Sequence, residues 1–141
     1  MKHSTMRVRE PLRKAKIMIV EDEVISALAL KEELQNLGFF VCSLASSGEK
    51  AIEIAAREHP DIALMDLGLL DEMDGIAASR EIWSRYSIPS IYITGSPEKL
   101  MKHKRLTESI ECLIKPVEID DLKAAVDSAL GKANLGQEND V

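Results

Sequence analysis

Short apolar runs alternate along the chain with segments whose apolar residues recur at helical spacing. This alternation is typical of a parallel β-sheet covered by helices on both faces, an α/β arrangement. Five strand and helix units can be counted, and we predict that they form one folded domain. The runs that predict strands are residues 17–20, 39–44, 62–65, 88–93 and 110–114.

The helices are predicted from apolar residues that stand three or four positions apart. Ser46, three residues before Glu49, has the spacing of a capping box and predicts the start of the second helix. Asp74-Gly75 is interpreted as turn chemistry ahead of the third helix. The inward positions are Ala27, Leu30, Leu34 and Leu37 in the first helix, Ile52, Ala55 and Ala56 in the second, Ile82, Trp83 and Tyr86 in the third, and Ile119, Leu122, Val126 and Ala129 in the last.

Charge is distributed unevenly along the chain. The first 16 residues hold six Lys or Arg and one acid, which gives them a net charge of +5. Because the whole chain has a net charge of −6, the remaining residues together carry −11. An acidic folded part argues against a nucleic-acid-binding surface on it. A turn at residues 94–97 is predicted to lead into a fourth helix with a basic exposed side, formed by Lys99, Lys102, Lys104 and Arg105.

The composition sets the domain boundaries and the expected compartment. Apolar residues make up 45% of the chain without any extended apolar run, which predicts a globular protein with no membrane span. We predict a basic flexible arm over residues 1–15, the folded domain over 16–131 and a disordered polar tail over 132–141. The first residues lack the apolar centre of a secretory signal, so we expect a cytoplasmic protein with reduced cysteines.

Reactive side chains follow four of the predicted strands. Asp22 follows the first strand, Asp66 ends the third, Thr94 ends the fourth and Lys115 follows the fifth. Ligands of doubly wound sheets bind outside the carboxyl ends of the strands, where these four residues are expected to converge. Lys115 alone would be a solvated turn residue and Thr94 alone a strand-end cap, so their joint placement carries the argument.

Carboxylates gathered at that edge indicate a metal site. Two carboxylates about 4 Å apart repel by ~4 kcal/mol at an effective dielectric of 20, which a cation relieves. Mg²⁺ prefers oxygen ligands and commonly takes one or two carboxylates with several waters. We predict Asp22 and Asp66 as direct ligands, Glu21 acting through a water, and the backbone carbonyl of Gly68. The acidic residues 21–23 taken alone would more often mark a helix start than a metal site. The three histidines, His3, His59 and His103, lack ligand spacing for zinc.

Asp66 is the predicted centre of the chemistry. A carboxylate held beside a metal can attack phosphorus and form an acyl phosphate. The Lys115 ammonium suits the phosphoryl oxygens, and the Thr94 hydroxyl can donate to them once phosphate is present.

The chain resembles the receiver domains of two-component response regulators over about residues 16–131. The resemblance rests on residues 19–23 (IVEDE), 61–66 (DIALMD), 73–75 (MDG), 91–95 (IYITG) and 113–116 (LIKP). It implies a flavodoxin-like, doubly wound five-stranded sheet of order 2-1-3-4-5 with five helices. It also implies transfer of a phosphoryl group from a sensor histidine kinase or phosphotransfer protein to Asp66 with Mg²⁺. The state of Asp66 would then reach a downstream protein, or a homodimer partner, through the face formed by strands four and five.

The chain departs from the usual receiver pattern at several positions. Cys112 stands where receivers usually carry an aromatic switch residue, so rotation of a ring toward Thr94 cannot occur there. Gly68 and Ser96 provide no carboxylate or amide to orient a hydrolytic water, which predicts a long-lived phosphorylated state. Residues 96–100 resemble receivers of the general-stress type, and no output domain follows, so a stand-alone receiver is expected. With strand order 2-1-3-4-5, Cys42 and Cys112 lie on opposite edge strands ~19 Å apart, too far for a disulfide.

Two other functions remain open on the sequence. An aspartate-dependent phosphatase also uses a strand-end aspartate with magnesium, but it carries a second acid two residues later, where this chain has Gly68. A pseudo-receiver would bind partners without phosphorylation, and the complete set of Asp22, Asp66, Thr94 and Lys115 argues against it. We therefore predict a signalling module rather than an enzyme.

Overall fold

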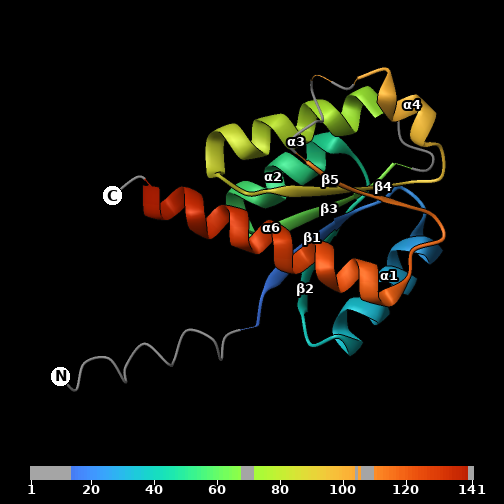
Figure 1. Cartoon of the computed structure of the whole chain (residues 1–141), viewed down its shortest axis with the longest axis horizontal. Helices are drawn as coiled ribbons and strands as arrows, with labels where there is room; N and C mark the ends of the chain where they lie inside the picture. Colours follow the sequence, from blue (N-terminus) through green and yellow to red (C-terminus); the bar gives the residue numbers. More distant parts are fainter. Residues whose placement is uncertain (1–13, 68–71, 104, 106–109, 140–141) are drawn as a thin grey trace.

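The core of the molecule is a single parallel sheet (Figure 1). A computed structural model describes residues 14–67, 72–103, 105 and 110–139. The strand order is β2-β1-β3-β4-β5, and every neighbouring pair is parallel. The predicted doubly wound, flavodoxin-like α/β fold is confirmed. The strands are β1 (Lys16–Val20), β2 (Phe40–Ala45), β3 (Ile62–Asp66), β4 (Ser90–Thr94) and β5 (Glu111–Ile114).

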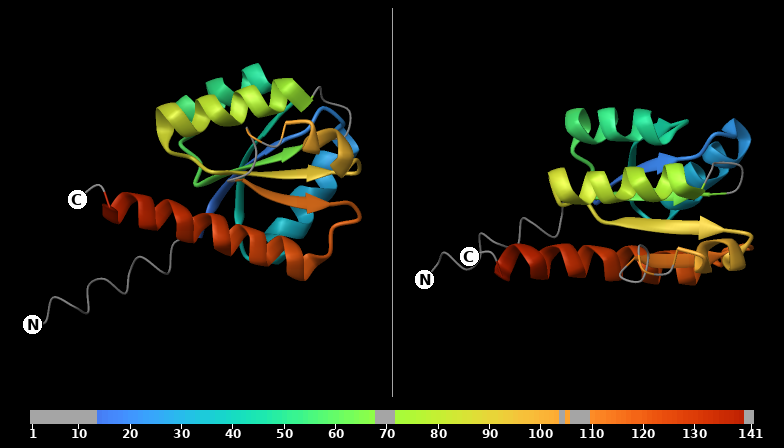
Figure 2. Two further views of the ribbon diagram at one scale, coloured as in Figure 1. Left: turned by 45° about the horizontal axis from the view of Figure 1, so that its top comes forward. Right: turned by 90° about the horizontal axis from the view of Figure 1, so that it is seen from above.

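Helices cover both faces of the sheet. Figure 2 shows α2 and α3 on one face, α1 and α6 on the other, and the short α4 beside the end of β4. Right-handed crossovers between parallel strands produce this three-layer arrangement. The helices are α1 (Val24–Asn36), α2 (Gly48–Glu58), α3 (Glu72–Tyr86), α4 (Pro97–Met101) and α6 (Ile119–Asn139).

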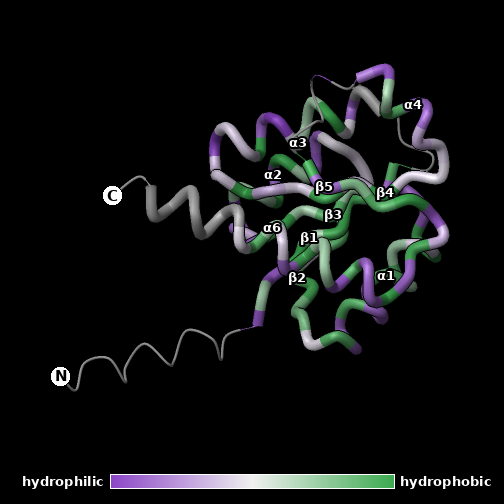
Figure 3. Tube along the Cα trace, in the orientation of Figure 1, coloured by the Kyte–Doolittle hydropathy of each residue, from purple (hydrophilic) through white to green (hydrophobic). Residues whose placement is uncertain are grey.

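Two apolar clusters lie on the two faces of the sheet, and the tube in Figure 3 shows hydrophobic residues concentrated along the strands. The cluster beneath α1 and α6 is built almost entirely from aliphatic side chains, including Ile17, Ile19, Leu64, Ile91 and Ile93. The cluster beneath α2 and α3 contains Met18, Met65, Ile76, Ile82, Tyr92 and, from α4, Leu100. Burial of this apolar surface is the main force that holds the layers together.

Strand β2 carries one extra residue relative to β1. Ile17 pairs with Val41 and Met18 pairs with Ser43, so Cys42 is left over as a β-bulge. Cys42 and Cys112 lie on the two edge strands, β2 and β5, and both are free thiols, as predicted.

The start of α2 differs from the prediction by one residue. The cap is Ser47 rather than Ser46: Ser47 has an extended backbone, and its hydroxyl accepts a hydrogen bond of 3.2 Å from the Lys50 N–H. Two consecutive serines offer the same capping chemistry, and the backbone conformation selects the second. Ala56 is exposed rather than inward, because Ala51 and Ala55 form the buried stripe of α2.

Asp74-Gly75 lies inside the first turn of α3, so its interpretation as a separate turn was wrong. Gly75 is favoured there by its close approach to Leu67, whose side chain would have to shift to admit a Cβ. A Cβ at this position would lie 2.5 Å from Leu67 Cδ2, and Leu67 is itself buried. In the rest of α3 Ile82 is buried as predicted, whereas Trp83 is 50% exposed.

Helix α4 is shorter than predicted and ends at Met101, so Lys102 caps it rather than extending it. Between Ser96 and His103, Leu100 is the residue that is fully buried, and a single buried position cannot anchor a long amphipathic helix. Lys104 lies outside the described residues, and Arg105 is exposed beyond the end of α4.

Helix α6 is longer than predicted. Its backbone continues to Asn139, through residues 132–139 that were predicted to be a disordered tail. The chain has no proline after Pro116, and the two glycines within α6, Gly131 and Gly136, each cost only about 1 kcal/mol relative to alanine. Ile119 in its first turn is 50% exposed rather than inward. Residues 1–13 of the predicted arm and residues 140–141 lie outside the described part of the chain. Among the helices that the structure describes, none combines the length and apolar character needed to cross a membrane.

Candidate functional site

The predicted reactive residues lie along the carboxyl edge of the sheet. Glu21 and Asp22 directly follow β1, Asp66 is the last residue of β3, Thr94 is the last of β4, and Lys115 directly follows β5. In the order β2-β1-β3-β4-β5 the strands that follow β1 in sequence are added first on one side of it (β2) and then on the other (β3), so Glu21 and Asp66 flank the topological switch point. Ligands of open α/β sheets bind at this point.

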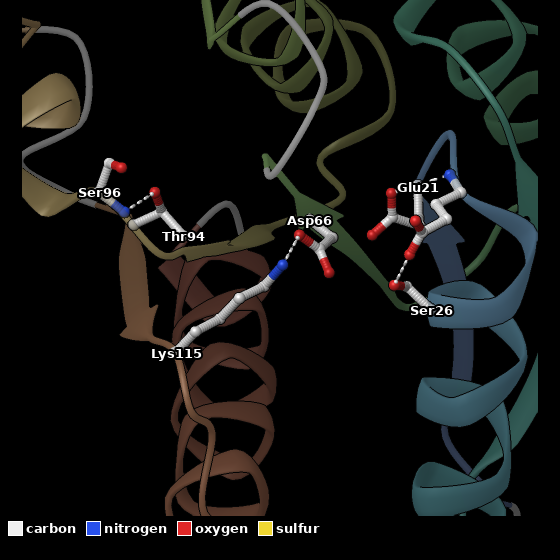
Figure 4. A network of polar contacts seen from close by, with 7 residues as sticks. Glu21, Ser26, Asp66, Thr94, Ser96 and Lys115 are labelled. Carbon is white, nitrogen blue, oxygen red and sulfur yellow. Dashed lines mark hydrogen bonds and ion pairs between the residues drawn. The ribbon is translucent and has the colours of Figure 1, made fainter.

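An ion pair joins the third strand to the end of the fifth. Lys115 Nζ lies 2.9 Å from Asp66 Oδ1 (Figure 4). The Asp66 side chain is 3% exposed, whereas that of Lys115 is 38% exposed and reaches in from the rim. The backbone supports this geometry, because the Lys115 N–H donates to the Thr94 carbonyl at 2.9 Å and the Leu67 N–H donates to the Ile93 carbonyl at 2.8 Å. The predicted meeting of Asp66 and Lys115 is therefore present.

Thr94 is buried, and its hydroxyl faces the start of α4. The Ser96 N–H donates to Thr94 Oγ1 at 3.0 Å, and Figure 4 shows this oxygen directed toward Ser96 rather than toward Asp66. A hydroxyl that accepts one hydrogen bond still has its own proton to donate. Thr94 is thus linked to the β4–α4 turn in this conformation.

Glu21 lies on the side of Asp66 opposite Lys115 (Figure 4). Glu21 is buried, and its Oε2 accepts a hydrogen bond of 3.0 Å from the Glu23 N–H. Burial, together with the neighbouring carboxyls of Asp66 and Asp22, raises the pKa of Glu21 to about 8. Glu21 therefore holds a proton at neutral pH unless a cation compensates its charge. Asp22 is exposed.

The donor chemistry of this edge fits a hard divalent cation held by few protein ligands. Among the described residues, no three His, Cys, Asp or Glu side chains form a group that could hold a metal ion. The neighbouring carboxyls of Glu21 and Asp66, whose crowding raises the Glu21 pKa, supply oxygen donors. Mg²⁺ binds through one or two carboxylates and keeps several waters, so this set fits Mg²⁺ better than a metal that needs a full protein cage. Gly68, the predicted carbonyl ligand, lies outside the described residues.

The first turn of α3 contacts the residue that follows Asp66 and is also bonded to the start of α2. Leu67, which directly follows Asp66, packs against Gly75, where a side chain would collide with it. The Asp74 carboxylate accepts a hydrogen bond of 3.2 Å from the Gly48 N–H at the start of α2. A Cβ at Gly48 would lie 3.0 Å from Asp74 oxygens. The Asp74-Gly75 pair therefore positions the site, a role that the turn interpretation missed although the motif was visible.

A family model agrees with this geometry: the model described as response regulator receiver domain matches residues 17–127. The chain belongs to the response regulator receiver domain family. This receiver domain shares the family's fold and its signalling character. The match lies within the folded domain predicted over residues 16–131.

Relatives and solved structures support the same assignment. The receiver domain is 31% identical over 118 residues to the transcriptional regulatory protein PdtaR of Mycobacterium tuberculosis, covering 83% of this chain and 57% of PdtaR. It is 30% identical to the phyllosphere-induced regulator PhyR of Methylorubrum extorquens, covering 81% of this chain and 43% of PhyR. The chain thus spans about half the length of these relatives.

A solved receiver domain shows how far the fold is shared. It is the signal receiver domain of a modulated diguanylate cyclase from Desulfovibrio desulfuricans G20, with a TM-score of 0.77 and 31% identity. The alignment covers 88% of this chain and 99% of that domain. The fold assignment therefore does not depend on one region of the chain.

Cys112 is the clearest departure within this frame. It is exposed on β5, in register with the fully buried Tyr92 of β4. Although the residue as a whole is exposed, partial burial of its thiol raises the pKa of that thiol, so the side chain is neutral at physiological pH. The aromatic residue at this level of the sheet is Tyr92, which belongs to the neighbouring strand β4 and is buried in the core.

Proposed function

We propose that this receiver domain accepts a phosphoryl group on Asp66 and thereby switches a protein-interaction surface. The observation that carries the proposal is the contact of 2.9 Å between Lys115 Nζ and Asp66 Oδ1 at the switch point of the sheet. Asp66 is buried, so its carboxylate has exchanged most of its water for neighbours within the protein. Such a carboxylate, held in place beside a fixed cation, is suited to act as a nucleophile.

The proposed donor is a phosphohistidine on a sensor histidine kinase or on a phosphotransfer protein. A carboxylate oxygen of Asp66 attacks phosphorus, the phosphorus–nitrogen bond breaks, and the departing imidazole takes up a proton. The product is an acyl phosphate on Asp66. The Lys115 ammonium balances the charge of the phosphoryl oxygens as they approach.

Asp22, Asp66, Glu21 through a water, and the Gly68 carbonyl are the proposed holders of Mg²⁺. When bound, Mg²⁺ supplies positive charge that offsets the negative oxygens of carboxylates and phosphate. Asp66 and Glu21 are oriented for this by the backbone, because each lies at the end of a central strand. The raised pKa of Glu21 means that cation binding must displace its proton at neutral pH.

Thr94 is the proposed sensor of the phosphoryl group. Its hydroxyl now accepts from the Ser96 N–H. A phosphoryl oxygen near Asp66 would attract the hydroxyl proton, and movement of Thr94 would release or shift Ser96 at the start of α4. Gly68 and Ser96 offer no carboxylate or amide to orient water, which favours a slow loss of the phosphoryl group.

The proposed output face lies on β4, β5 and α4. Apolar side chains are exposed there: Met101 at the end of α4 is 67% exposed, Ile114 on β5 is 55% exposed, and Cys112 is exposed beside it. A downstream protein or a second copy of the chain is the proposed occupant. Mass measurement in solution with and without beryllofluoride tests the homodimer.

The test is incubation of the protein with Mg²⁺ and acetyl phosphate, followed by intact mass spectrometry and phosphate-affinity gels. Asp66→Asn should take up no phosphoryl group, while Asp127→Asn, which changes an exposed aspartate on α6, should label like the wild type. Labelling of Asp66→Asn at the wild-type level would refute the proposal. Absence of label from any donor would favour a pseudo-receiver, and sustained turnover of phosphate esters would favour a phosphatase.

A further inference from the structure

Tyr92 occupies the interior beside the proposed switch. It lies in β4 two residues before Thr94, so the two side chains point to the same face of the sheet. Tyr92 is fully buried and shares its apolar cluster with Met65, which precedes Asp66 in the sequence, and with Leu100 of α4. Its neighbour in register on β5 is the small and exposed Cys112.

The Tyr92 hydroxyl is hydrogen-bonded to a helix. It contacts the hydroxyl of Ser79 in α3, and Ser79 Oγ donates in turn to the Ile76 carbonyl at 2.9 Å. A serine hydroxyl has one proton, and here it goes to Ile76, so Tyr92 must be the donor to Ser79. Burial raises the pKa of Tyr92, which keeps this proton in place.

Buried polar contacts of this kind fix the relative position of two elements. A hydroxyl left without its partner inside an apolar cluster is unfavourable, so β4 and α3 are expected to move together. Ser79 is itself buried, and the half-exposed Trp83 lies one helical turn further along α3. A displacement of β4 at Tyr92 would therefore reach the surface of α3.

We propose that the hydrogen-bonded pair of Tyr92 and Ser79 couples Thr94 to α3, so that the state of Asp66 is transmitted to α3 as well as to the β4–β5 face. Tyr92 and Ser79 are positioning residues: they touch neither the phosphoryl group nor the metal. The pair links the end of β4 to a helix within the core. Cys112 cannot provide such a link, because it has no aromatic ring that could move toward Thr94. This inference rests on the proposed phosphorylation of Asp66.

Trp83 provides a direct readout of α3, because it is the one tryptophan of the chain. The experiment records Trp83 fluorescence before and after addition of Mg²⁺ and beryllofluoride, and measures Asp66 labelling by acetyl phosphate in parallel. The variants are Tyr92→Phe and Ser79→Ala, which remove the pair from either side. The matched control is Tyr86→Phe, which removes a tyrosine hydroxyl from α3 without touching the pair. A second variant, Cys112→Ser, tests the position at which receivers usually carry an aromatic switch residue.

In the wild type we expect labelling of Asp66 together with a change in Trp83 fluorescence. In Tyr92→Phe and in Ser79→Ala labelling should persist, while the fluorescence change falls about fivefold, the size of a modest coupling between sites. The double variant should lose no more than either single variant, because both remove one hydrogen bond. Tyr86→Phe and Cys112→Ser should respond like the wild type.

Distinct results separate this inference from the proposed function. No label on the wild-type protein overturns the proposed function and this coupling with it. A labelled wild type with no Trp83 change, or an undiminished change in Tyr92→Phe, overturns the coupling alone. A change lost equally in Cys112→Ser would also overturn it. Urea unfolding of each variant identifies any that is not folded, and Ser79→Ala keeps the test decisive if Tyr92→Phe fails to fold.

Discussion

The two ends of the parallel sheet each hold a lysine and an aspartate, in different surroundings. At the amino end the Lys16 N–H donates to Asp61 Oδ2 at 2.8 Å, the Asp61 N–H donates to the Lys16 carbonyl at 2.7 Å, and Lys16 Nζ donates to the Glu58 carbonyl at 2.6 Å. At the carboxyl end Lys115 contacts Asp66 through an ion pair, and Glu21 borders the same carboxylate.

This contrast shows how similar residue types serve different purposes. At the amino end each charged group is paired with the backbone, which stabilises the junction of β1 with β3. At the carboxyl end acids crowd one another beside the Lys115 ammonium, an arrangement that favours the arrival of a cation. We therefore expect Asp61 at the amino end to act on stability alone, whereas Lys115 acts on the chemistry and Glu21 on the pH dependence of the site.

The largest expected effect is the pH dependence caused by Glu21. Its pKa is raised from 4.5 to about 8, so the folded state keeps a proton that the unfolded state releases. The stabilising effect of this proton is complete below pH 4.5 and is lost as the pH rises toward 8, on the order of a few kcal/mol without Mg²⁺. Urea unfolding across this range measures it. Glu21→Gln should flatten the dependence, and an unchanged slope in that variant would contradict the assignment.

Removal of the ammonium from the carboxyl end should affect reactivity next most strongly. Lys115→Ala should slow labelling of Asp66 by acetyl phosphate about 100-fold, or ~2.7 kcal/mol in the barrier. Its free energy of unfolding should change by less than about 1 kcal/mol, because the Lys115 side chain is partly exposed. Lys123→Ala on α6, which removes an exposed lysine in another ion pair, is the control. A labelling rate within twofold of the wild type would exclude the proposed role of Lys115.

At the amino end we expect the free energy of unfolding to change and the labelling rate of Asp66 to stay the same. Asp61→Ala removes the acceptor of the Lys16 N–H and should lower the free energy of unfolding by about 2 kcal/mol, with labelling of Asp66 unchanged. Urea unfolding and labelling kinetics on the same preparation measure both. Slower labelling at unchanged stability would mean that the two ends are not separate in function.

The smallest expected effect concerns the cap of α2, which follows β2 at the carboxyl end of the sheet. Ser47→Ala removes the cap of α2 and should cost about 1 kcal/mol of stability without altering the labelling rate. Ser46→Ala, at the exposed neighbour that does not cap, should cost less. Equal losses from the two serines would contradict the cap seen in the structure.

The sequence predicted the fold and the meeting of Asp66 with Lys115, because strand ends and their direction follow from the alternating pattern and the topology. Parallel strands bring residues that follow them to one edge without any knowledge of side-chain conformations. Strand order came through the family resemblance, and the structure confirms it. The roles of Thr94 and of the metal ligands stay predictions.

The details that sequence reasoning missed depend on packing in three dimensions. Gly75 resembles a turn glycine until Leu67 is placed against it, and Ser46 resembles a cap until the backbone of Ser47 is known. The contact of Tyr92 with Ser79 joins a strand to a helix 13 positions away and leaves no local pattern. An amphipathic helix would permit Ser79 at a buried position only with such a partner.

The bulge at Cys42 has a consequence for how copies of the protein can associate. An outermost strand with a regular hydrogen-bonding edge is a template on which another chain can add a strand, the first step of aggregation. The extra residue interrupts the regular spacing of β2 and increases its local twist. Growth of the sheet from molecule to molecule is thereby disfavoured along β2.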